Sequence, residues 1–413
     1  MKNVIDALIE RGLIDQMTHA ELRERVNQPM KVYVGFDPTA DSLHLGNLIG
    51  IMGLAWFQKF GHTPVAVLGG ATGLIGDPSG KNVERNLLDQ KTLAFNVRSL
   101  ESFFKKVLRH SIILNNNDWL GKVTLIDFLR DVGKHFRLGP MMAKEMVRSR
   151  LESEEGMSFT EFSYQILQAY DFCYLCKEHG VTLQMGGSDQ WGNITAGTEL
   201  NRKLGGETLY GLTFPLLTRS DGKKFGKSEE GAIWLSSDKL SPYQFYQHLV
   251  RVADADVIKL LKMLTFLDLA EIREIEAGMD VPNSAQKRLA EEVTRFVHGE
   301  EGLEAALKVT EGMNPGSEAK LSGALLKELA DDMPSMELPL SDVVGQKYVD
   351  LAVKVGLISS KSEGSKLIKN GGAYLNNERI VDPALTIEPS HLIENSYLLF
   401  SAGKKKRFLI KLI

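Results

Sequence analysis

Cysteine is almost absent from the chain, whose 413 residues include only Cys173 and Cys176. So few thiols exclude a disulfide-stapled scaffold and fit a reducing compartment. The Cys-x-x-Cys spacing could in principle form a redox pair or half of a zinc site. Because no second pair exists and the motif adjoins an aromatic run that begins at Tyr170, we interpret both residues as reduced thiols of the core.

The chain also lacks any long uncharged apolar run. A helix that spans a membrane needs about 18 or more such residues, and no run in the sequence is that long. The N-terminal segment places Asp6, Glu10 and Arg11 among its apolar residues, which is not the pattern of a signal peptide. We therefore expect a cytoplasmic protein that does not enter a membrane.

An excess of charge of one sign is missing as well. The 49 lysines and arginines face 53 aspartates and glutamates, which gives a net charge of −4. The chain as a whole is therefore not a basic nucleic-acid binder. The average hides an asymmetry, because residues 346–413 hold 11 basic against 6 acidic side chains. A basic C-terminal part on an acidic body indicates a polyanionic partner for that part.

Hydrophobic residues make up 43% of the chain, which provides a sizeable core and excludes a disordered or fibrous protein. Helical patterns separate four apolar runs that we interpret as buried strands. These runs are residues 31–36, 64–70, 111–116 and 181–187. Continuous apolar strands that alternate with helices predict an α/β fold with a doubly wound parallel sheet. Ligands of such folds bind at the carboxyl ends of the strands.

Composition changes along the chain predict the domain boundaries. We expect a catalytic α/β domain over residues 1–235 and a helical domain over 236–310, where helix formers dominate. Residues 311–345 carry seven acidic residues against two lysines and are predicted to be a linker. Residues 346–413 are expected to form two helices followed by short β segments.

The segment GFDPTADSLHLGN, residues 35–47, joins a predicted strand to a predicted helix. The N-terminus of a helix offers unpaired N–H groups to an anion. Asp37 and Thr39 could cap the helix or bind a ribose, and His44 could donate to a phosphate. An ordinary strand–turn–helix with Asp37 as the N-cap explains the segment equally well.

The glycine-rich run GGATGLIGDPSGK, residues 69–81, does not fit a P-loop. Ile75 stands where the first glycine of that motif is required, and Lys81 is followed by Asn82 instead of serine or threonine. A dinucleotide-binding fingerprint does not match either. We interpret the run as a pocket wall and a loop that brings Lys81 and Arg85 toward an anion.

Residues 219–231, RSDGKKFGKSEEG, form a predicted loop with four cations between glycines. Lys224 and Lys227 lie three residues apart, and the hydroxyl of Ser228 follows directly. Lysines in such a loop suit the stabilisation of a triphosphate whose charge shifts during a reaction. The alternative is a solvated basic loop without a specific ligand.

The helix predicted over residues 158–176 is apolar nearly all round, so it should be buried. Tyr164, Gln168 and Asp171 share one of its faces. Buried polar groups need partners, and either an internal hydrogen-bond network or a small polar ligand could supply them. The strand-end segment MGGSDQWGN, residues 185–193, adds Asp189 and Gln190.

Together and in this order, these segments resemble the class I aminoacyl-tRNA synthetases and, within them, the bacterial tyrosyl branch. His44-Leu-Gly46-Asn47 is similar to the HIGH signature, and Lys224-Phe-Gly-Lys227-Ser228 is similar to the KMSKS signature. Four more segments resemble the tyrosyl branch specifically: YVGFDPTADSLHLG, GGATGLIGDPSGK, SFTEFSYQILQAYDF and GGSDQWGNITAG. The similarity extends over nearly the whole chain and implies a Rossmann-like catalytic domain and a C-terminal RNA-binding domain of the ribosomal-protein type.

The resemblance implies a pocket for L-tyrosine, with Tyr33 and Asp171 at the phenol. The residues implied at the other end of tyrosine are Asp77, Tyr164, Gln168 and Gln190. Those implied to bind ATP are Gly35, Asp37, His44, Gly46, Asn47, Gly187, Asp189, Lys224, Lys227 and Ser228. The reaction at the α-phosphate would be assisted by His44, Thr39, Lys224, Lys227, Lys81 and Arg85.

The implied activity has two steps. The carboxylate of tyrosine attacks the α-phosphate of ATP, and the tyrosyl-adenylate then acylates the terminal ribose of tRNA(Tyr). The chemistry is positioning and charge stabilisation. Mg²⁺ is expected to arrive with ATP, without a dedicated protein site. The resemblance further implies a homodimer, and residues Lys404, Lys405, Lys406 and Arg407 are expected to contact tRNA.

Asn47 departs from the family pattern, because it replaces the second histidine of the HIGH signature. The form HLGN is also reminiscent of the tryptophanyl branch, and Asp171 could accept from an indole N–H as well as from a phenol. Two other functions stay open: an RNA-binding protein without activity that kept the fold, and a nucleotidyltransferase that activates a carboxylate without tRNA. The joint presence of His44, Lys224 and Lys227 favours the synthetase.

Overall fold

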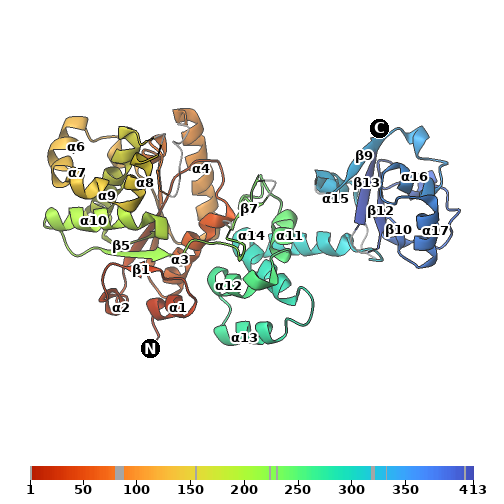
Figure 1. Cartoon of the computed structure of the whole chain (residues 1–413), viewed down its shortest axis with the longest axis horizontal. Helices are drawn as coiled ribbons and strands as arrows, with labels where there is room; N and C mark the ends of the chain where they lie inside the picture. The colour runs from red at the N-terminus through yellow and green to blue at the C-terminus, as the bar shows by residue number, and fades with distance from the viewer. Residues whose placement is uncertain are drawn as a thin grey trace. The chain divides into compact units, whose positions relative to one another are not determined.

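The computed structural model of the chain describes residues 2–79, 88–153, 156–222, 225–228, 231–317, 321–331, 333–403 and 406–413. The chain divides into two compact units (Figure 1). The first comprises residues 1–241 and 245–299, and the second comprises residues 242–244 and 300–413.

A six-stranded sheet forms the centre of the first unit. Its strands are β1 (Gln16–Met17), β2 (Lys31–Phe36), β3 (Thr63–Leu68), β4 (Ile112–Asn115), β5 (Val181–Gly187) and β6 (Tyr210–Phe214). They lie in the order β1-β6-β5-β2-β3-β4, and all neighbours are parallel except β1 and β6. The predicted α/β fold with a parallel sheet is confirmed, and the four predicted strands are β2 to β5.

The order of the strands reverses between β2 and β5. From β2 the chain moves outward to β3 and β4, then returns to the other side of β2 to form β5 and β6. The connections that follow β2 and β5 therefore lead away from each other. Such a reversal leaves a crevice at the carboxyl ends of the two strands, and this is where open α/β sheets bind ligands.

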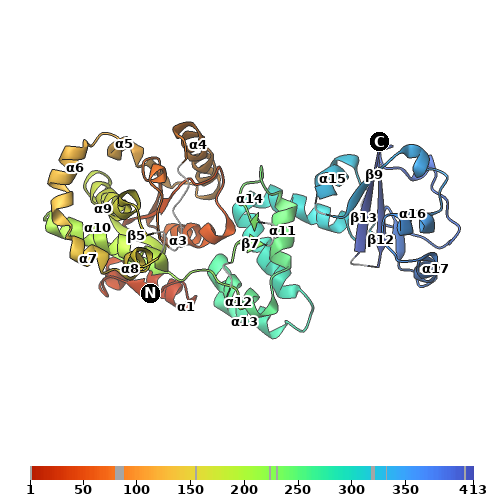
Figure 2. The ribbon, with the colours of Figure 1, turned by 45° about the horizontal axis from the view of Figure 1, so that its top comes forward.

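Helices cover both faces of this sheet (Figure 2). Those of residues 1–241 are α1 (Val4–Glu10), α2 (Leu22–Arg25), α3 (Leu48–Lys59), α4 (Gln90–Val107), α5 (Asn117–Leu120), α6 (Leu125–Asp131), α7 (Leu138–Met142), α8 (Glu145–Leu151), α9 (Phe159–His179) and α10 (Trp191–Lys203). Side chains of β2 alternate between the faces, as the period of a strand requires. Tyr33 packs against Phe172 of α9, whereas Val34 and Phe36 lie beside Gly50 of α3.

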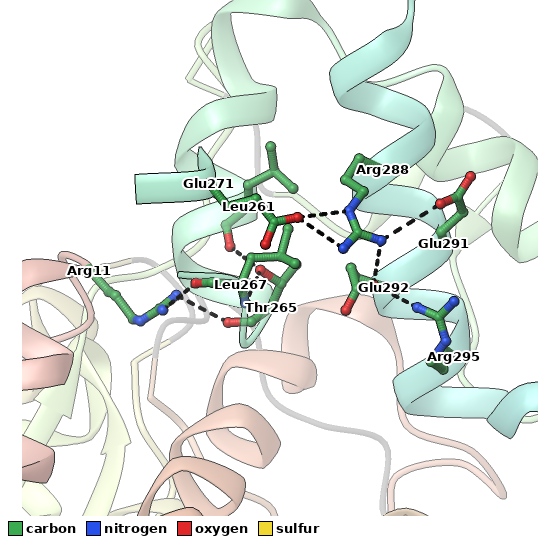
Figure 3. A network of polar contacts seen from close by, with 9 residues as sticks. All are labelled: Arg11, Leu261, Thr265, Leu267, Glu271, Arg288, Glu291, Glu292 and Arg295. Carbon is green, nitrogen blue, oxygen red and sulfur yellow. Dashed lines mark hydrogen bonds and ion pairs between the residues drawn. The ribbon is translucent and has the colours of Figure 1, made fainter. Parts of the chain in front are cut away.

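Four helices follow the sheet: α11 (Pro242–Val250), α12 (Asp254–Leu264), α13 (Leu269–Ala277) and α14 (Ser284–Gly312). Arg288 of α14 joins α13 to α14, because its guanidinium donates to Glu271 at 3.0 Å and to Glu292 at 2.8 Å (Figure 3). The helix α14 breaks at Gly299, whose φ of 76° and ψ of −179° are accessible essentially to glycine alone. The boundary between the two compact units falls at this residue.

Arg11 connects the N-terminal helix to this helical segment. Its side chain is 6% exposed and donates to the carbonyl oxygens of Lys262, Thr265 and Leu267, at the C-terminal end of α12 (Figure 3). The guanidinium also lies 4.3 Å from the ring centroid of Trp56 on α3. A buried cation is stable only when its donors are satisfied, and the carbonyls at the end of a helix provide acceptors and partial negative charge.

The second unit contains a five-stranded sheet in the order β11-β10-β12-β13-β9. Its strands are β9 (Ser335–Leu338), β10 (Ala373–Leu375), β11 (Glu378–Arg379), β12 (Tyr397–Ala402) and β13 (Lys406–Leu412), and its helices are α15 (Gly323–Glu328), α16 (Tyr348–Lys354) and α17 (Lys361–Lys369). Two apolar clusters pack on its opposite faces, since Leu398 and Phe400 belong to one and Leu399 to the other. The two helices predicted after residue 346 are confirmed as α16 and α17.

The segment predicted to be a linker and the basic C-terminal segment both contribute regular elements to the second unit. The predicted linker contributes α15 and β9, and Leu326 and Leu329 of this stretch are fully buried. The basic C-terminal segment forms β13, because Phe408, Leu409 and Ile410 are buried between its polar ends. The buried residues of both segments lie among charged residues in the sequence, so composition alone does not reveal them. Among the described residues, every helix is too short or too polar to cross a bilayer.

Replacement of Arg11 by alanine should destabilise the first unit by about 3 kcal/mol, because three carbonyl acceptors and the indole lose a charged partner. The measurement is urea denaturation followed by tryptophan fluorescence, which reports this unit alone because all 4 tryptophans belong to it. Arg273→Ala is the matched control, since Arg273 is exposed on α13. A loss below about 0.5 kcal/mol for Arg11→Ala, the range of ordinary surface changes, would contradict the assigned role.

Candidate active site

A cavity of about 430 Å³ opens at the carboxyl ends of β2 and β5, where the reversal of strand order predicts a ligand site. It brings together fourteen residues that the sequence singled out from four separate segments. They are Tyr33, Gly35, Asp37, Thr39, His44, Gly46, Asn47, Asp77, Tyr164, Gln168, Asp171, Gly187, Asp189 and Gln190.

The remaining candidates do not line this cavity in the described structure. Lys81, Arg85, Lys224, Lys404 and Lys405 lie outside the described residues, and so do the side chains of Lys227 and Ser228. Lys406 and Arg407 belong to β13 of the second unit. Lys406 is exposed there, whereas Arg407 is partly buried, and this burial lowers the pKa of its guanidinium.

The segment from His44 to Asn47 forms a tight turn at the start of α3. The backbone N–H of His44 donates to the side-chain oxygen of Asn47 at 3.0 Å, so Asn47 fixes the turn that presents the histidine. Gly226 lies directly against this turn with a φ of 101°, and a Cβ atom there would come within 2.7 Å of the Gly46 nitrogen. Only glycine satisfies both the conformation and the contact.

Asp37 is the meeting point of the segments after β2, β3 and the buried helix α9. Its carboxylate accepts from the hydroxyl of Tyr164 at 2.9 Å and from that of Thr72 at 2.9 Å. Burial is the main reason that the pKa of Tyr164 lies well above its usual range, and the nearby charge of Asp37 adds to it. Tyr164 therefore stays protonated and acts as a hydrogen-bond donor.

A second polar network connects α9 with the turn after β5. Gln190 donates to Asp77 at 2.7 Å, and its side-chain oxygen accepts from Gln168 at 3.3 Å. Asn193 donates to Gln168 at 3.1 Å and closes the network. The carboxylate of Asp77 also accepts the N–H of Ser79 at 2.9 Å. This end of the cavity thus offers one carboxylate and several amides to a ligand with both donors and acceptors.

Asp171 stands at the apolar end of the cavity and is 4% exposed. One carboxylate oxygen accepts from the indole N–H of Trp119 at 2.6 Å, and the other accepts from Asn116 at 3.0 Å. Burial raises the pKa of Asp171 to about 7, although both donors act in the opposite direction. The hydroxyl of Tyr33 is also buried, and no partner lies within hydrogen-bonding distance of it among the described residues.

The sequence analysis missed four residues of these networks: Thr72, Asn116, Trp119 and Asn193. Asn116 follows the strand predicted at 111–116, so the rule that ligand-binding residues follow strand ends could have found it. Thr72 lies in the glycine-rich run that was interpreted as a pocket wall. Asn193 lies in the strand-end segment 185–193 that also holds Asp189 and Gln190, so the same rule could have found it. Trp119 carries no sequence signal, because its role depends on how α5 approaches α9.

The cavity therefore has two chemically different ends. At one end, the buried Asp171 and Tyr33 lie in apolar surroundings and suit a flat side chain with a single polar tip. At the other, Asp77 and the amides suit an ammonium and a carboxylate. Asp37, Gly35, His44 and Gly187 line the same cavity. Such a site can align a carboxylate with a phosphate.

Family comparisons agree with this geometry. Residues 24–313 match the family described as tRNA synthetases class I (W and Y). Residues 326–410 match the C-terminal domain described as tyrosine–tRNA ligase SYY-like. The fold is thus that of a class I tRNA synthetase of the tryptophan and tyrosine type.

Individual relatives narrow the assignment. The chain is 59% identical to a tyrosine–tRNA ligase from Protochlamydia amoebophila, with 100% of both chains covered. It is 52% identical to the chloroplastic/mitochondrial tyrosine–tRNA ligase of Arabidopsis thaliana, over 99% of this chain and 84% of the relative. A C-terminally truncated mitochondrial tyrosyl-tRNA synthetase from Aspergillus nidulans superimposes with a TM-score of 0.65 and 32% identity, covering 74% of this chain and 92% of that one. The chain belongs to the tyrosine–tRNA ligase family.

Replacement of Trp119 by phenylalanine should raise the pKa of Asp171 further above about 7, because it removes a donor that stabilises the ionised carboxylate. The titration can be followed by the carboxyl resonance of ¹³C-labelled aspartate, identified by its absence in Asp171→Asn. Trp234→Phe is a suitable control, since Trp234 lines the same cavity without a bond to Asp171. An unchanged or lower pKa in Trp119→Phe would show that the indole does not stabilise the charge.

Proposed function

We propose that the cavity carries out the two steps of tyrosine–tRNA ligation, activation of L-tyrosine by ATP and transfer of the tyrosyl group to tRNA(Tyr). The tyrosine carboxylate attacks the α-phosphate, pyrophosphate leaves, and the mixed anhydride then acylates the 3′-terminal adenosine. The observation that supports this best is the buried carboxylate of Asp171 at the closed, apolar end of a cavity whose other end is polar.

The phenol of tyrosine would donate to Asp171, whose ionised carboxylate has acceptor sites beyond the two used by Trp119 and Asn116. The hydroxyl of Tyr33 would complete the contact. Phenylalanine would leave the buried hydroxyl of Tyr33 without a partner and a further acceptor site of Asp171 unfilled. It would therefore be rejected by orders of magnitude, an effect for which this enzyme family is the known example. Asp77, Tyr164, Gln168 and Gln190 would bind the amino acid part.

ATP would occupy the side of the cavity formed by β2 and the start of α3. Gly35, Asp37, Gly187 and Asp189 would hold its adenine and ribose, since the glycines permit close approach of a flat ligand. His44, Thr39 and the backbone at Gly46 and Asn47 would meet the phosphates, with Asn47 acting through the turn that it stabilises.

The cations of Lys224 and Lys227 would stabilise the charge that moves onto pyrophosphate, assisted by Ser228, Lys81 and Arg85. This function is supported by the family signature. It is also supported by sequence position, because the two lysines flank Phe225 and Gly226, and these two residues contact Gly46. Mg²⁺ would arrive with ATP and be held mainly by its phosphates.

The second unit would bind tRNA. Its final 68 residues have the excess of basic side chains expected for a polyanionic partner. Lys406 is exposed and available for a phosphate, and Lys404 and Lys405 precede it in the sequence. Arg407 is partly buried beside Tyr243, so its contribution would be to support β13 more than to contact RNA.

A homodimer is the assembly that the exposed apolar surface of the first unit favours. The helix α6 buries none of its residues, and Leu125 and Ile126 are each 69% exposed. Leu138 of α7 adds a further apolar side chain that is 64% exposed. The two helices lie next to each other in both views (Figures 1 and 2). Large exposed apolar side chains in one region mark a protein interface.

The function is tested by exchange of labelled pyrophosphate into ATP without tRNA, with tyrosine, tryptophan and phenylalanine in parallel. We expect exchange with tyrosine alone, since the first step needs no RNA. Exchange with tryptophan instead would overturn the assignment of the pocket around Asp171. A folded protein that binds tRNA but supports no exchange with any of the three would be an RNA-binding protein without activity.

The Michaelis constant for tyrosine in this assay should rise as the pH falls below about 7. Burial raises the pKa of Asp171 to about 7, so the ionised form that accepts the phenol proton is fully present above this pH and is lost below it. The expected change approaches tenfold per pH unit, the limit for a single protonation. Asp171→Asn should bind tyrosine weakly with no such dependence, and a wild-type constant that stays flat between pH 5 and 8 would contradict the role of this carboxylate.

A further inference from the structure

A buried carboxylate on α12 binds a residue of the loop that contains the signature lysines. Asp256 is 5% exposed, and its side chain points away from solvent although it lies in the first turn of its helix. One carboxylate oxygen accepts the backbone N–H of Ser220 at 2.8 Å, and the other accepts the hydroxyl of the same serine at 3.3 Å. Both oxygens of this buried carboxylate thus accept hydrogen bonds from one residue, which lies 36 positions earlier in the chain. Burial of a carboxylate is costly unless it is hydrogen-bonded in this way.

Ser220 lies at the start of the loop of residues 219–231. Phe225 and Gly226, the next described residues after Gly222, line the cavity. The N–H of Phe225 donates to the carbonyl oxygen of Leu217 at 2.8 Å. Gly226 then lies against the Gly46 nitrogen so closely that a Cβ atom would overlap it. The loop is therefore fixed at two described points, α12 on one side and the histidine turn on the other.

The helix α12 is itself held at its opposite end. The carbonyls of Thr265 and Leu267 accept from Arg11, which also packs on Trp56 near the C-terminal end of α3 (Figure 3). The N-terminal end of the same α3 carries the turn at Gly46. Arg11 thus links α12 to α3 near the C-terminal ends of both helices. Near their N-terminal ends, α12 contacts the loop through Asp256, and the turn before α3 contacts it at Gly46.

We propose that Asp256 is a positioning residue for adenylate formation. Through its two hydrogen bonds to Ser220, it fixes the start of the lysine loop at the distance from the histidine turn that the reaction requires. Asp256 touches no substrate and acts through the loop alone. The proposal rests on the proposed function, because it concerns the placement of a loop whose lysines act on the phosphates of ATP.

The competing explanation is that Asp256 only stabilises the fold. An acidic residue in the first turn of a helix interacts favourably with the helix dipole wherever its side chain points. Asp254 provides the control that separates the two, because it lies in the same first turn, carries the same charge and is exposed. Its carboxylate accepts from Gln286 of α14, not from the loop.

The test compares Asp256→Asn with Asp254→Asn in the full-length protein. Both variants lose the same charge at the same helix terminus. We expect the rate constant kcat of tyrosine-dependent pyrophosphate exchange to fall about tenfold in Asp256→Asn, with the Michaelis constant for tyrosine unchanged. Asp254→Asn should keep both constants, because it leaves Ser220 in place. Equal kcat values for Asp256→Asn and the wild type would overturn the proposal, and so would equal losses in the two variants.

A second variant approaches the same contact from the loop. Ser220→Ala removes the hydroxyl partner at an exposed position, so it should fold whether or not Asp256→Asn does. We expect kcat to fall about threefold at constant tyrosine affinity, because the stronger bond to the backbone N–H remains. Combined with Asp256→Asn, it should produce no further loss, since the two changes remove one interaction. An unchanged kcat in Ser220→Ala, or a fully additive loss in the double variant, would contradict the proposal.

Failure of this inference is distinguishable from failure of the proposed function. If the wild-type protein supports no exchange with tyrosine, the proposed function itself is wrong. If the wild type is active and Asp256→Asn matches it, the function stands and the positioning role is wrong. Hydrogen exchange at the amide of Ser220 gives a readout without substrate, because its protection should fall in Asp256→Asn, where the charge-assisted bond is weakened, and be kept in Asp254→Asn.

Discussion

The parallel pairing of β2 with β5 is the constraint on which the site depends. These strands are neighbours although about 140 residues of chain separate them, and the order of the sheet reverses between them. Their carboxyl ends therefore release Asp37 and Gly187 into one crevice, and the turn at His44 closes it from the side of α3. A register shift of one residue would turn Tyr33 away from α9 and toward α3, and the apolar end of the cavity would lose its wall.

The carboxylates that line the cavity need much of the structure around them. Asp37, Asp77 and Asp171 are held by donors from different segments, and each donor is itself fixed by a helix or a strand end. Such networks are stabilising only when complete, since an unpaired carboxylate in the interior is costly. The architecture around Asp171 leaves the carboxylate oriented before a ligand arrives, so binding does not need to reorganise it. Preorganisation of this kind favours discrimination between ligands that differ by one hydroxyl.

Much of the fold follows from the sequence, because its strongest signals are periodic and local. The strands β2 to β5 are continuous apolar runs, and the face shared by Tyr164, Gln168 and Asp171 is a property of helical spacing alone. The strands β1, β6 and β9 were missed, since β1 has two residues, and apolar positions of β6 and β9 alternate with polar ones or glycine. Trp119 could not be predicted, because only tertiary packing brings it to Asp171. The roles of Lys224 and Lys227 come from the family signature, and the structure contributes the anchoring of the residues around them.

The contacts of α12 suggest why a helical segment is packed against a catalytic sheet at all. A loop rich in lysine and glycine loses considerable conformational entropy when it is fixed, so it needs support from rigid elements. The turn at Gly46 supplies one support, and α12 supplies the second through its contact with Ser220. Asp256 provides that support by a buried, charge-assisted bond, which is directional in a way that apolar packing is not. The same helix is tied to α3 through Arg11, so a displacement of the helical segment would move the loop relative to the histidine turn. The position of the helical segment and that of the loop beside the histidine turn are thus coupled through one side chain at each end of α12, Asp256 and Arg11.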